Sequence, residues 1–142
     1  SRLAVMDSES FYDKFIAPDF EEHYVPKAFE QVCKQFLIRK NRSGELEDSF
    51  EKIGKYWYDD PVNHKNGEFD IVTENDDSYI FYEAKFREEK LDKNLIWNEI
   101  QQVNNTGLIC SKYGFFSKTG YKEIDEEYKK QLILFTIEDL YR

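Results

Sequence analysis

Two apolar runs separated by a short polar gap make up the segment GEFDIVTENDDSYIFYEAKF, residues 67–86, and this segment constrains the fold more than any other. The alternation of apolar and polar residues predicts two strands, Glu68–Glu74 and Tyr79–Phe86. The turn-forming residues between them predict a hairpin closed by a four-residue loop, Asn75–Ser78. The chain is therefore expected to build a sheet around this hairpin.

The hairpin register decides which charged residues meet. A symmetric loop pairs Glu74 with Tyr79 and, further along the same register, places Asp70 opposite Glu83. Because side chains alternate along a strand, Lys85 projects from the same face as Glu83. The register thus predicts one patch of three ionisable side chains, and an opposite, apolar face that comprises Ile80, Tyr82, Ala84 and Phe86.

The facing carboxylates of Asp70 and Glu83 indicate a specific chemistry. Like charges directly opposed across two strands destabilise a sheet unless something compensates them, and a cation does so. Carboxylate oxygens are ligands for Mg²⁺, and a neighbouring lysine can bind phosphate or orient water. This pattern is typical of a phosphodiester hydrolase. An ordinary hairpin with a solvated outer face has the same spacing, so the spacing leaves both interpretations open.

The remaining elements follow from periodicity and turn residues. We expect helices over 8–16, from Pro26 onward and over 93–105, and a polar helix over 122–131. Strands are expected over 52–60, 113–118 and 132–137, with a last turn over 138–142. The helix that begins near Pro26 has an apolar stripe formed by Phe29, Val32, Cys33, Phe36 and Leu37. This order predicts an α/β protein with a mixed sheet flanked by helices.

Length and charge limit the class of protein. The 142 residues suit one domain, 1–142, in which residues 1–25 form an N-terminal helical extension. A net charge of −9 disfavours strong nonspecific binding to nucleic acid but leaves room for a small local groove. No apolar run is long enough to span a bilayer and no secretion signal is evident, so we expect a cytoplasmic protein without a membrane partner. Cys33 and Cys110 lack metal-ligand spacing and are expected to be buried thiols.

The same residues carry a family resemblance. Asp70 in EFDIV and Glu83-Ala84-Lys85 in YIFYEAKF resemble the strand-borne Asp and Glu-x-Lys of the PD-(D/E)XK nuclease superfamily. AFEQVCKQFL supplies Glu30 where the superfamily commonly has a helical Glu. The ordered set FEQVC, IGKYWYDD, GEFDIV, YEAKF and YGFFSKTGY further resembles the nuclease-like C-terminal domain of unknown function of predicted archaeal-type AAA+ ATPases.

The resemblance implies a restriction-endonuclease-like αβββαβ core and a Mg²⁺- or Mn²⁺-dependent nuclease. Asp70 and Glu83 would bind the metal, Lys85 would position or activate water, and Glu30 would assist. Gln101 or Gln102 would support the site, although WNEIQQV is not a clean match. It also implies an ATPase domain N-terminal to this chain, which opens on Ser1 and is expected to be a fragment of a longer polypeptide. A catalytically inactive nuclease fold that serves protein–protein interaction or regulates the ATPase is the alternative, and the acidic charge favours it.

Two surface features bear on nucleic-acid binding. Trp57 and Trp97 could stack bases, but a core or sheet-edge position is the stronger expectation. A basic cluster follows the hairpin, but acidic residues interleave with it and leave a local excess of one positive charge; it comprises Lys85, Arg87, Lys90 and Lys93. GFFSKTG lacks the Gly that precedes Lys-Ser/Thr in a phosphate-binding loop, so it does not predict nucleotide binding.

Overall fold

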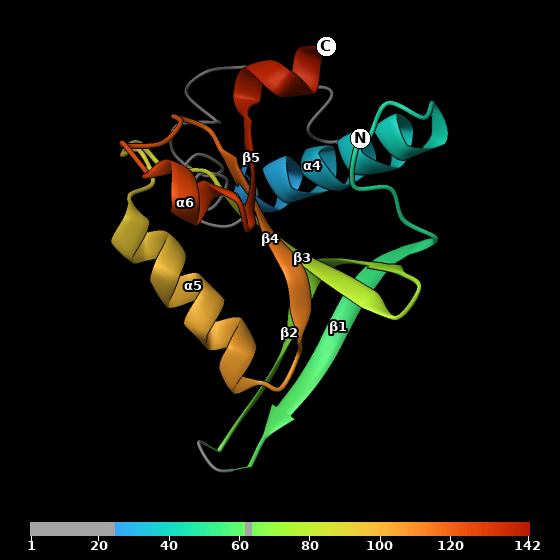
Figure 1. Ribbon diagram of the computed structural model, residues 1–142, viewed down its shortest axis with the longest axis vertical. Helices are drawn as coiled ribbons and strands as arrows, with labels where there is room; N and C mark the ends of the chain where they lie inside the picture. The colour runs from blue at the N-terminus through green and yellow to red at the C-terminus, as the bar shows by residue number, and fades with distance from the viewer. Residues whose placement is uncertain (1–24, 62–63) are drawn as a thin grey trace, which may run out of the picture.

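The computed structural model describes residues 25–61 and 64–142. The helix expected over 8–16 lies outside the described residues. The elements, labelled as in Figure 1, run in the order α4 (Val25–Arg42), β1 (Lys52–Asp60), β2 (Lys65–Asn75), β3 (Ser78–Lys85), α5 (Lys93–Asn105), β4 (Cys110–Ser117), α6 (Glu126–Lys129), β5 (Leu132–Thr136) and the 3₁₀ turn η3 (Ile137–Tyr141). The predicted α/β class is confirmed.

The strands form one mixed sheet in the order β1-β2-β3-β4-β5. The first three strands are antiparallel neighbours, whereas β4 runs parallel to both β3 and β5. A parallel neighbour requires a crossover connection, and α5 supplies it between β3 and β4. The αβββαβ order that the resemblance implies is thus present.

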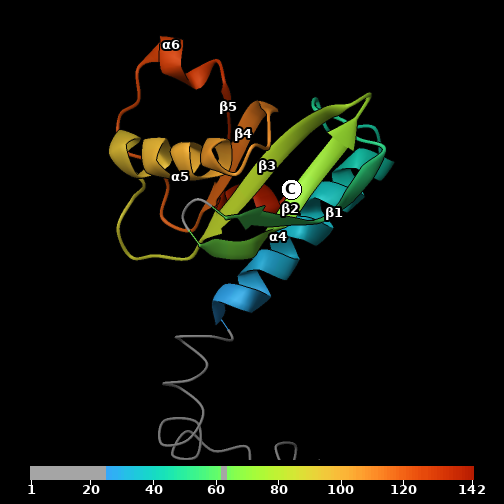
Figure 2. The same cartoon turned by 90° about the horizontal axis from the view of Figure 1, so that it is seen from below.

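Two helices cover opposite faces of the sheet, as Figures 1 and 2 show together. On one face, α4 buries Phe29, Cys33, Phe36 and Leu37 against the sheet. On the other face, α5 buries Ile96, Ile100 and Val103 in a second core cluster. Each helix therefore contributes an apolar stripe at helical spacing, and its outer face is polar.

The buried stripe of α4 is narrower than predicted. Val32 was expected in it, but half of its surface is exposed, at 50%. The helix packs mainly against β3, so only the residues that face this strand are covered. The apolar face of β3 is as predicted, because Ile80, Tyr82, Ala84 and Phe86 all belong to the α4 cluster.

The C-terminal region differs from expectation in two respects. The helix predicted over 122–131 is only Glu126–Lys129, because the preceding chain is extended: Tyr121 bridges to Leu91 and Ile124 is buried. Asp125 then begins the short helix by accepting a hydrogen bond from the backbone N–H of Tyr128 at 2.8 Å. The strand predicted over 132–137 ends at Thr136, and as a sheet edge it is half-buried beyond its first residue.

The two cysteines and the two tryptophans differ in how far they are buried. Cys33 is fully buried, whereas Cys110 is only partly buried. Trp57 and Trp97 are not in the core, since 73% and 51% of their surfaces are exposed. Trp57 lies on the edge strand β1 and Trp97 on α5. Among the described residues, no helix is long and apolar enough to cross a bilayer.

Candidate functional site

The β2–β3 ladder ends where the two predicted carboxylates would face each other. Its register is the predicted one, with Glu74 opposite Tyr79 and Val72 opposite Phe81. The backbone pairing of β2 with β3 ends at Ile71 and Tyr82, one position before Asp70 and Glu83. The carboxylates therefore lie just beyond the end of the ladder. The turn is shorter than predicted, because Asn75 and Ser78 still pair with each other.

A β-bulge in β2 positions Asp70. Along β1, Gly54 pairs with Val72 and Tyr56 pairs with Phe69, so two residues of β2, Asp70 and Ile71, lie opposite Lys55 alone. The bulge also appears in the packing: Phe69 and Val72 belong to the α5 core cluster, while Ile71 belongs to the α4 cluster. Bulges re-aim side chains and end regular pairing, and both effects occur at Asp70.

The bulged Asp70 lies beside Glu30 of α4. Their carboxyl groups are within hydrogen-bonding reach. Burial raises the pKa of Glu30 above its ordinary value, the charge of Asp70 raises this pKa further, and the Lys27 ammonium, 3.8 Å from Glu30, lowers it. Burial and the neighbouring carboxylate thus both disfavour the ionised form of Glu30.

One oxygen of Asp70 has no hydrogen-bond partner. Oδ1 is buried, and none of the described residues bonds to it. Oε2 of Glu68, two residues earlier on β2, is also buried without a hydrogen-bond partner. The other carboxylate oxygen of Glu68, Oε1, lies 3.4 Å from the Lys55 ammonium. Buried carboxylate oxygens without partners are costly, so each needs an explanation such as an ion or a water. The bulge region thus has unused oxygen ligands.

Glu83 occupies the centre of the charged group. Burial is the main cause that raises its pKa, to about 7; the nearby Lys85 lowers it, and Glu99, Glu30 and Asp70 raise it further. The charges of Glu99 on α5, Glu30 on α4 and Asp70 on β2 therefore all reach Glu83. A carboxyl group with a pKa near neutrality is half-ionised at physiological pH, and such groups are concentrated at functional sites.

Lys85 is held by a residue that the sequence-based prediction did not include. Its ammonium lies 2.8 Å from the carboxylate of Glu99 on α5. The helix residues considered for support of the site, Gln101 and Gln102, line a different cavity with Tyr58 and Lys65. The one sequence signal for Glu99 is its position on the helix, because it borders the buried stripe formed by Ile96 and Ile100.

The structure thus divides the predicted patch into two pairs. Asp70 contacts Glu30 of α4, Lys85 contacts Glu99 of α5, and Glu83 lies close enough to both pairs to feel their charges. Of the four residues predicted for the site, Glu30 and Asp70 lie beside each other, Lys85 pairs with Glu99 instead, and the charges of the other three predicted residues reach Glu83. A regular hairpin would have placed Asp70, Glu83 and Lys85 on one face.

The donor set suits a hard divalent cation. Carboxylate oxygens are available from Asp70 and Glu83, and Asp70 Oδ1 is buried and unpartnered. Within the described ranges no three His, Cys, Asp or Glu side chains are already gathered as a metal-binding group. Mg²⁺ usually takes only one or two carboxylates and completes its shell with water. A cation at this place would therefore have at most the two carboxylates of Asp70 and Glu83 as protein ligands of this kind among the described residues.

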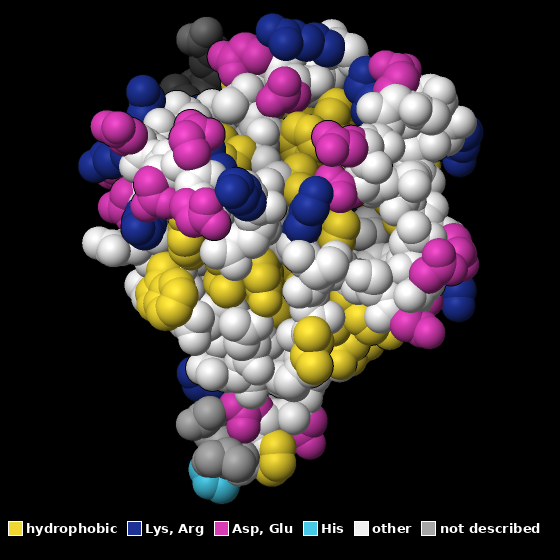
Figure 3. All heavy atoms as spheres, in the orientation of Figure 1, with side chains coloured by type: hydrophobic (Ala, Val, Ile, Leu, Met, Phe, Trp, Pro, Cys, Tyr) yellow, Lys and Arg dark blue, Asp and Glu magenta, His cyan; other side chains and the backbone are white. Residues whose placement is uncertain are grey.

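The basic cluster after β3 is largely neutralised by ion pairs. Besides Lys85 with Glu99, Arg87 lies 3.6 Å from Glu89 and Lys93 lies 2.9 Å from Asp125. The face shown in Figure 3 has interleaved acidic and basic side chains in its upper half, rather than a continuous basic surface. Any nucleic acid would have to bind mainly through local contacts.

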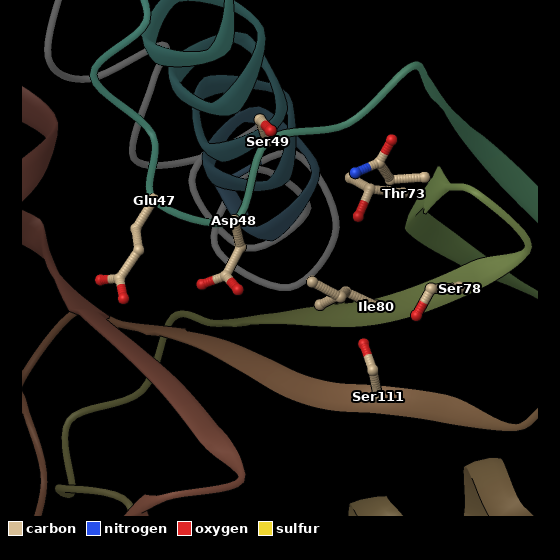
Figure 4. Close-up of a pocket in the computed structure, with 8 residues that line it drawn as sticks. Glu47, Asp48, Ser49, Thr73, Ser78, Ile80 and Ser111 are labelled. Carbon is tan, nitrogen blue, oxygen red and sulfur yellow. The ribbon is translucent and has the colours of Figure 1, made fainter.

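The polar pocket shown in Figure 4 is separate from the carboxylate group. It encloses about 200 Å³ and lies at the turn end of the hairpin, where Thr73 and Ser78 line it together with Asp48. Asp48 is ion-paired with Lys112 at 3.0 Å. Asp70 lies at the middle of β2, and Glu83 and Lys85 lie at the end of β3 that is far from the turn. The chemistry of the candidate site therefore does not involve this pocket.

Comparison with known proteins gives a family and a fold. The model of DUF234, archaeal and bacterial proteins of unknown function, matches residues 1–98. The uncharacterized protein MJECL04 of Methanocaldococcus jannaschii is 26% identical over 140 residues, which cover 96% of this chain and 30% of that protein. The crystal structure of AF1548, a protein of unknown function, matches with a TM-score of 0.53 at 17% identity, over 77% of this chain and 64% of that one.

These matches have different weight. The structural match supports the fold alone, because the identity is low. The chain spans less than a third of the length of its curated relative, so that protein as a whole can have parts with no counterpart here. The family model covers more than half of the chain, including Glu30, Asp70, Glu83 and Lys85. The chain belongs to the DUF234 family of archaeal and bacterial proteins of unknown function.

Proposed function

We propose that this domain is a divalent-cation-dependent nuclease that hydrolyses phosphodiester bonds. The observation that carries the proposal is the buried, unpartnered Oδ1 of Asp70, which the bulge places beside Glu30 and near Glu83 at the open end of the β2–β3 ladder. The resemblance to the PD-(D/E)XK superfamily supports the same residues. Asp70 and Glu83 would hold Mg²⁺ or Mn²⁺, which when bound lowers the pKa of a water and polarises phosphate.

The protein residues would act as follows. Lys85 exchanges its ion pair with Glu99 for the attacked phosphate and stabilises its charge. Glu99 is a positioning residue, since it holds the Lys85 ammonium in place before substrate binds. Glu30, whose pKa is raised by burial and by the charge of Asp70, would assist at the side of the bound cation, whose positive charge would favour the ionised form of Glu30.

An experiment on two carboxylates tests this function. We expect Glu83→Gln and Asp70→Asn to abolish Mn²⁺ binding, measured by calorimetry, and Mg²⁺-dependent cleavage of single- and double-stranded DNA and RNA. Glu74→Gln is the matched control, because Glu74 lies on the same hairpin but at its turn end. Cleavage that survives either site substitution, or absence of Mn²⁺ binding in the unaltered chain, contradicts the proposal.

A second function is favoured by different observations. The Lys85–Glu99 ion pair, the interleaved surface charges and the net charge of −9 suit a nuclease fold without catalytic activity that binds another protein. An ATPase domain N-terminal to this chain, which the family resemblance implies, would be the first partner to test. An inactive module would show neither Mn²⁺ binding nor cleavage, yet would alter the nucleotide hydrolysis rate of such a domain.

A further inference from the structure

β1 is an edge strand with a long, accessible outer side. It spans nine residues, Lys52–Asp60, and among the described residues it pairs only with β2. Figure 1 shows it as the outermost ribbon of the sheet, and α4 packs against β3 instead. An unpaired strand edge offers a row of backbone donors and acceptors to another strand.

The protection that β1 has against such pairing comes from the lysines and aspartates near its two ends, whose opposite charges can also attract a second copy of the strand. Proteins usually protect long edges with proline, bulges or a covering element, and the segment KIGKYWYDD contains no proline. The bulge opposite Lys55 is in β2, so it leaves β1 itself regular from Tyr56 to Asp60. Trp57 lies near the middle of this edge with 73% of its surface exposed, so a large aromatic side chain is available to a partner there.

We propose that two copies of this chain associate through β1, paired antiparallel about Trp57. In this register Trp57 lies opposite its own copy, Tyr56 lies opposite Tyr58, and Lys55 lies opposite Asp59, each pair occurring twice. Lys55, Trp57 and Asp59 are exposed on one face, while Tyr56 and Tyr58 are partly buried on the other. The strand is thus complementary to itself in charge and in aromatic character.

Alternative registers of the same strand lack this match. Centring the pair on Lys55 or on Asp59 places two like charges directly opposite each other, which destabilises an antiparallel pair. Centring it on Tyr56 replaces the pairing of Lys55 with Asp59 by that of Lys52 with Asp60, but it places Trp57 opposite Lys55 and leaves only Tyr56 paired with an aromatic side chain. Opposite-charge and aromatic cross-strand pairs each stabilise a sheet. The Trp57-centred register has both kinds, because it pairs Trp57 with its copy, Tyr56 with Tyr58 and Lys55 with Asp59, and it is therefore the most favourable of these registers.

The association would have a geometric consequence for the candidate site. Antiparallel pairing of identical edges creates a twofold axis perpendicular to the sheet, so both copies present the same face on the same side. Lys55, at the interface, also lies 3.4 Å from Glu68, next to the bulged Asp70. The two Glu30–Asp70 pairs of a dimer would therefore lie on the same side of a continuous sheet, the side that α4 covers. The association itself does not depend on the proposed nuclease function.

Light scattering coupled to size-exclusion chromatography tests the association. We expect a dimer for the unaltered chain at high concentration and about a 10-fold weaker dimer for Trp57→Lys, which places two like charges at the axis. Trp97→Lys is the matched control, because this tryptophan is also exposed but lies on α5. A chain that is monomeric throughout, or a dimer that Trp57→Lys leaves intact, overturns the proposal.

A charge exchange tests the register. Lys55→Asp and Asp59→Lys should each weaken the dimer, and the double variant should restore it, because the opposite charges again face each other across the axis. Thermal unfolding followed by circular dichroism checks that each variant is folded, which matters for Lys55→Asp because Glu68 is close. If folded single variants dimerise normally, or the double variant is no better than they are, the Trp57-centred register is wrong.

Discussion

Replacement of Glu83 by glutamine should stabilise the protein in a pH-dependent way. Burial raises the pKa of Glu83 from its ordinary value of 4.5 to about 7 in the folded state. The protonated carboxyl therefore contributes stability that is fully present below pH 4.5 and is lost as the pH rises through about 7. Glutamine resembles the protonated carboxyl and does not ionise, so the stability of the variant should not fall as the pH rises through this range.

The size of the effect follows from the two pKa values. A difference between 4.5 and about 7, at 1.36 kcal/mol per pKa unit, corresponds to roughly 3 kcal/mol of unfolding free energy. We expect Glu83→Gln to have nearly the same stability as the unaltered chain at acidic pH. Above neutral pH it should be more stable by about 2 to 3 kcal/mol, since the neighbouring charges can rearrange in part.

Urea denaturation across this pH range, in the presence of a chelator, measures the difference. Glu88→Gln is the control, because the Glu88 side chain is 85% exposed and its loss should give no such trend. A stability difference between Glu83→Gln and the unaltered chain that stays flat with pH would refute the reasoning about burial. Adding Mg²⁺ above neutral pH should then stabilise the unaltered chain alone, because the cation needs the ionised carboxylate.

Two substitutions and one labelling experiment test the packing and the turn. Gly114→Ala should destabilise the chain by about 2 to 4 kcal/mol in urea denaturation, because a Cβ there would overlap the buried Tyr82 ring; normal stability would contradict the close packing. Asp77→Gly should stabilise the hairpin by about 0.5 to 1 kcal/mol, because Asp77 has a φ of 65°; a loss of stability would show that the aspartate itself matters. Burial raises the pKa of Cys33 to about 12, so its thiol should react with a disulfide reagent only after unfolding, and rapid labelling of Cys33 in the native protein at mildly alkaline pH would show that the α4 face opens.

The sequence by itself determined the sheet elements and the hairpin register. Strand alternation predicted the pairing of Glu74 with Tyr79, and the structure has it. Apolar spacing predicted α5 and the burial of Phe29 on α4. These features depend on interactions between neighbours along the chain or across one turn, so a local pattern contains the information. Three of the residues expected at the site, Asp70, Glu83 and Lys85, could be named for the same reason. The fourth, Glu30, was named from the family resemblance.

Only the tertiary structure decided how those four residues meet. The bulge at Asp70 cannot be predicted from the alternation of β2, because it appears only when the register against β1 is known. The ion pair of Lys85 with Glu99 joins a strand to a helix that crosses the sheet, so it depends on the packing of α5. The pKa of Glu83, about 7, depends first on its burial in the fold and then on the charges of Lys85 and Glu99, which the fold brings near it. Burial, long-range charge and strand register are properties of the assembled sheet, and a linear pattern does not specify them.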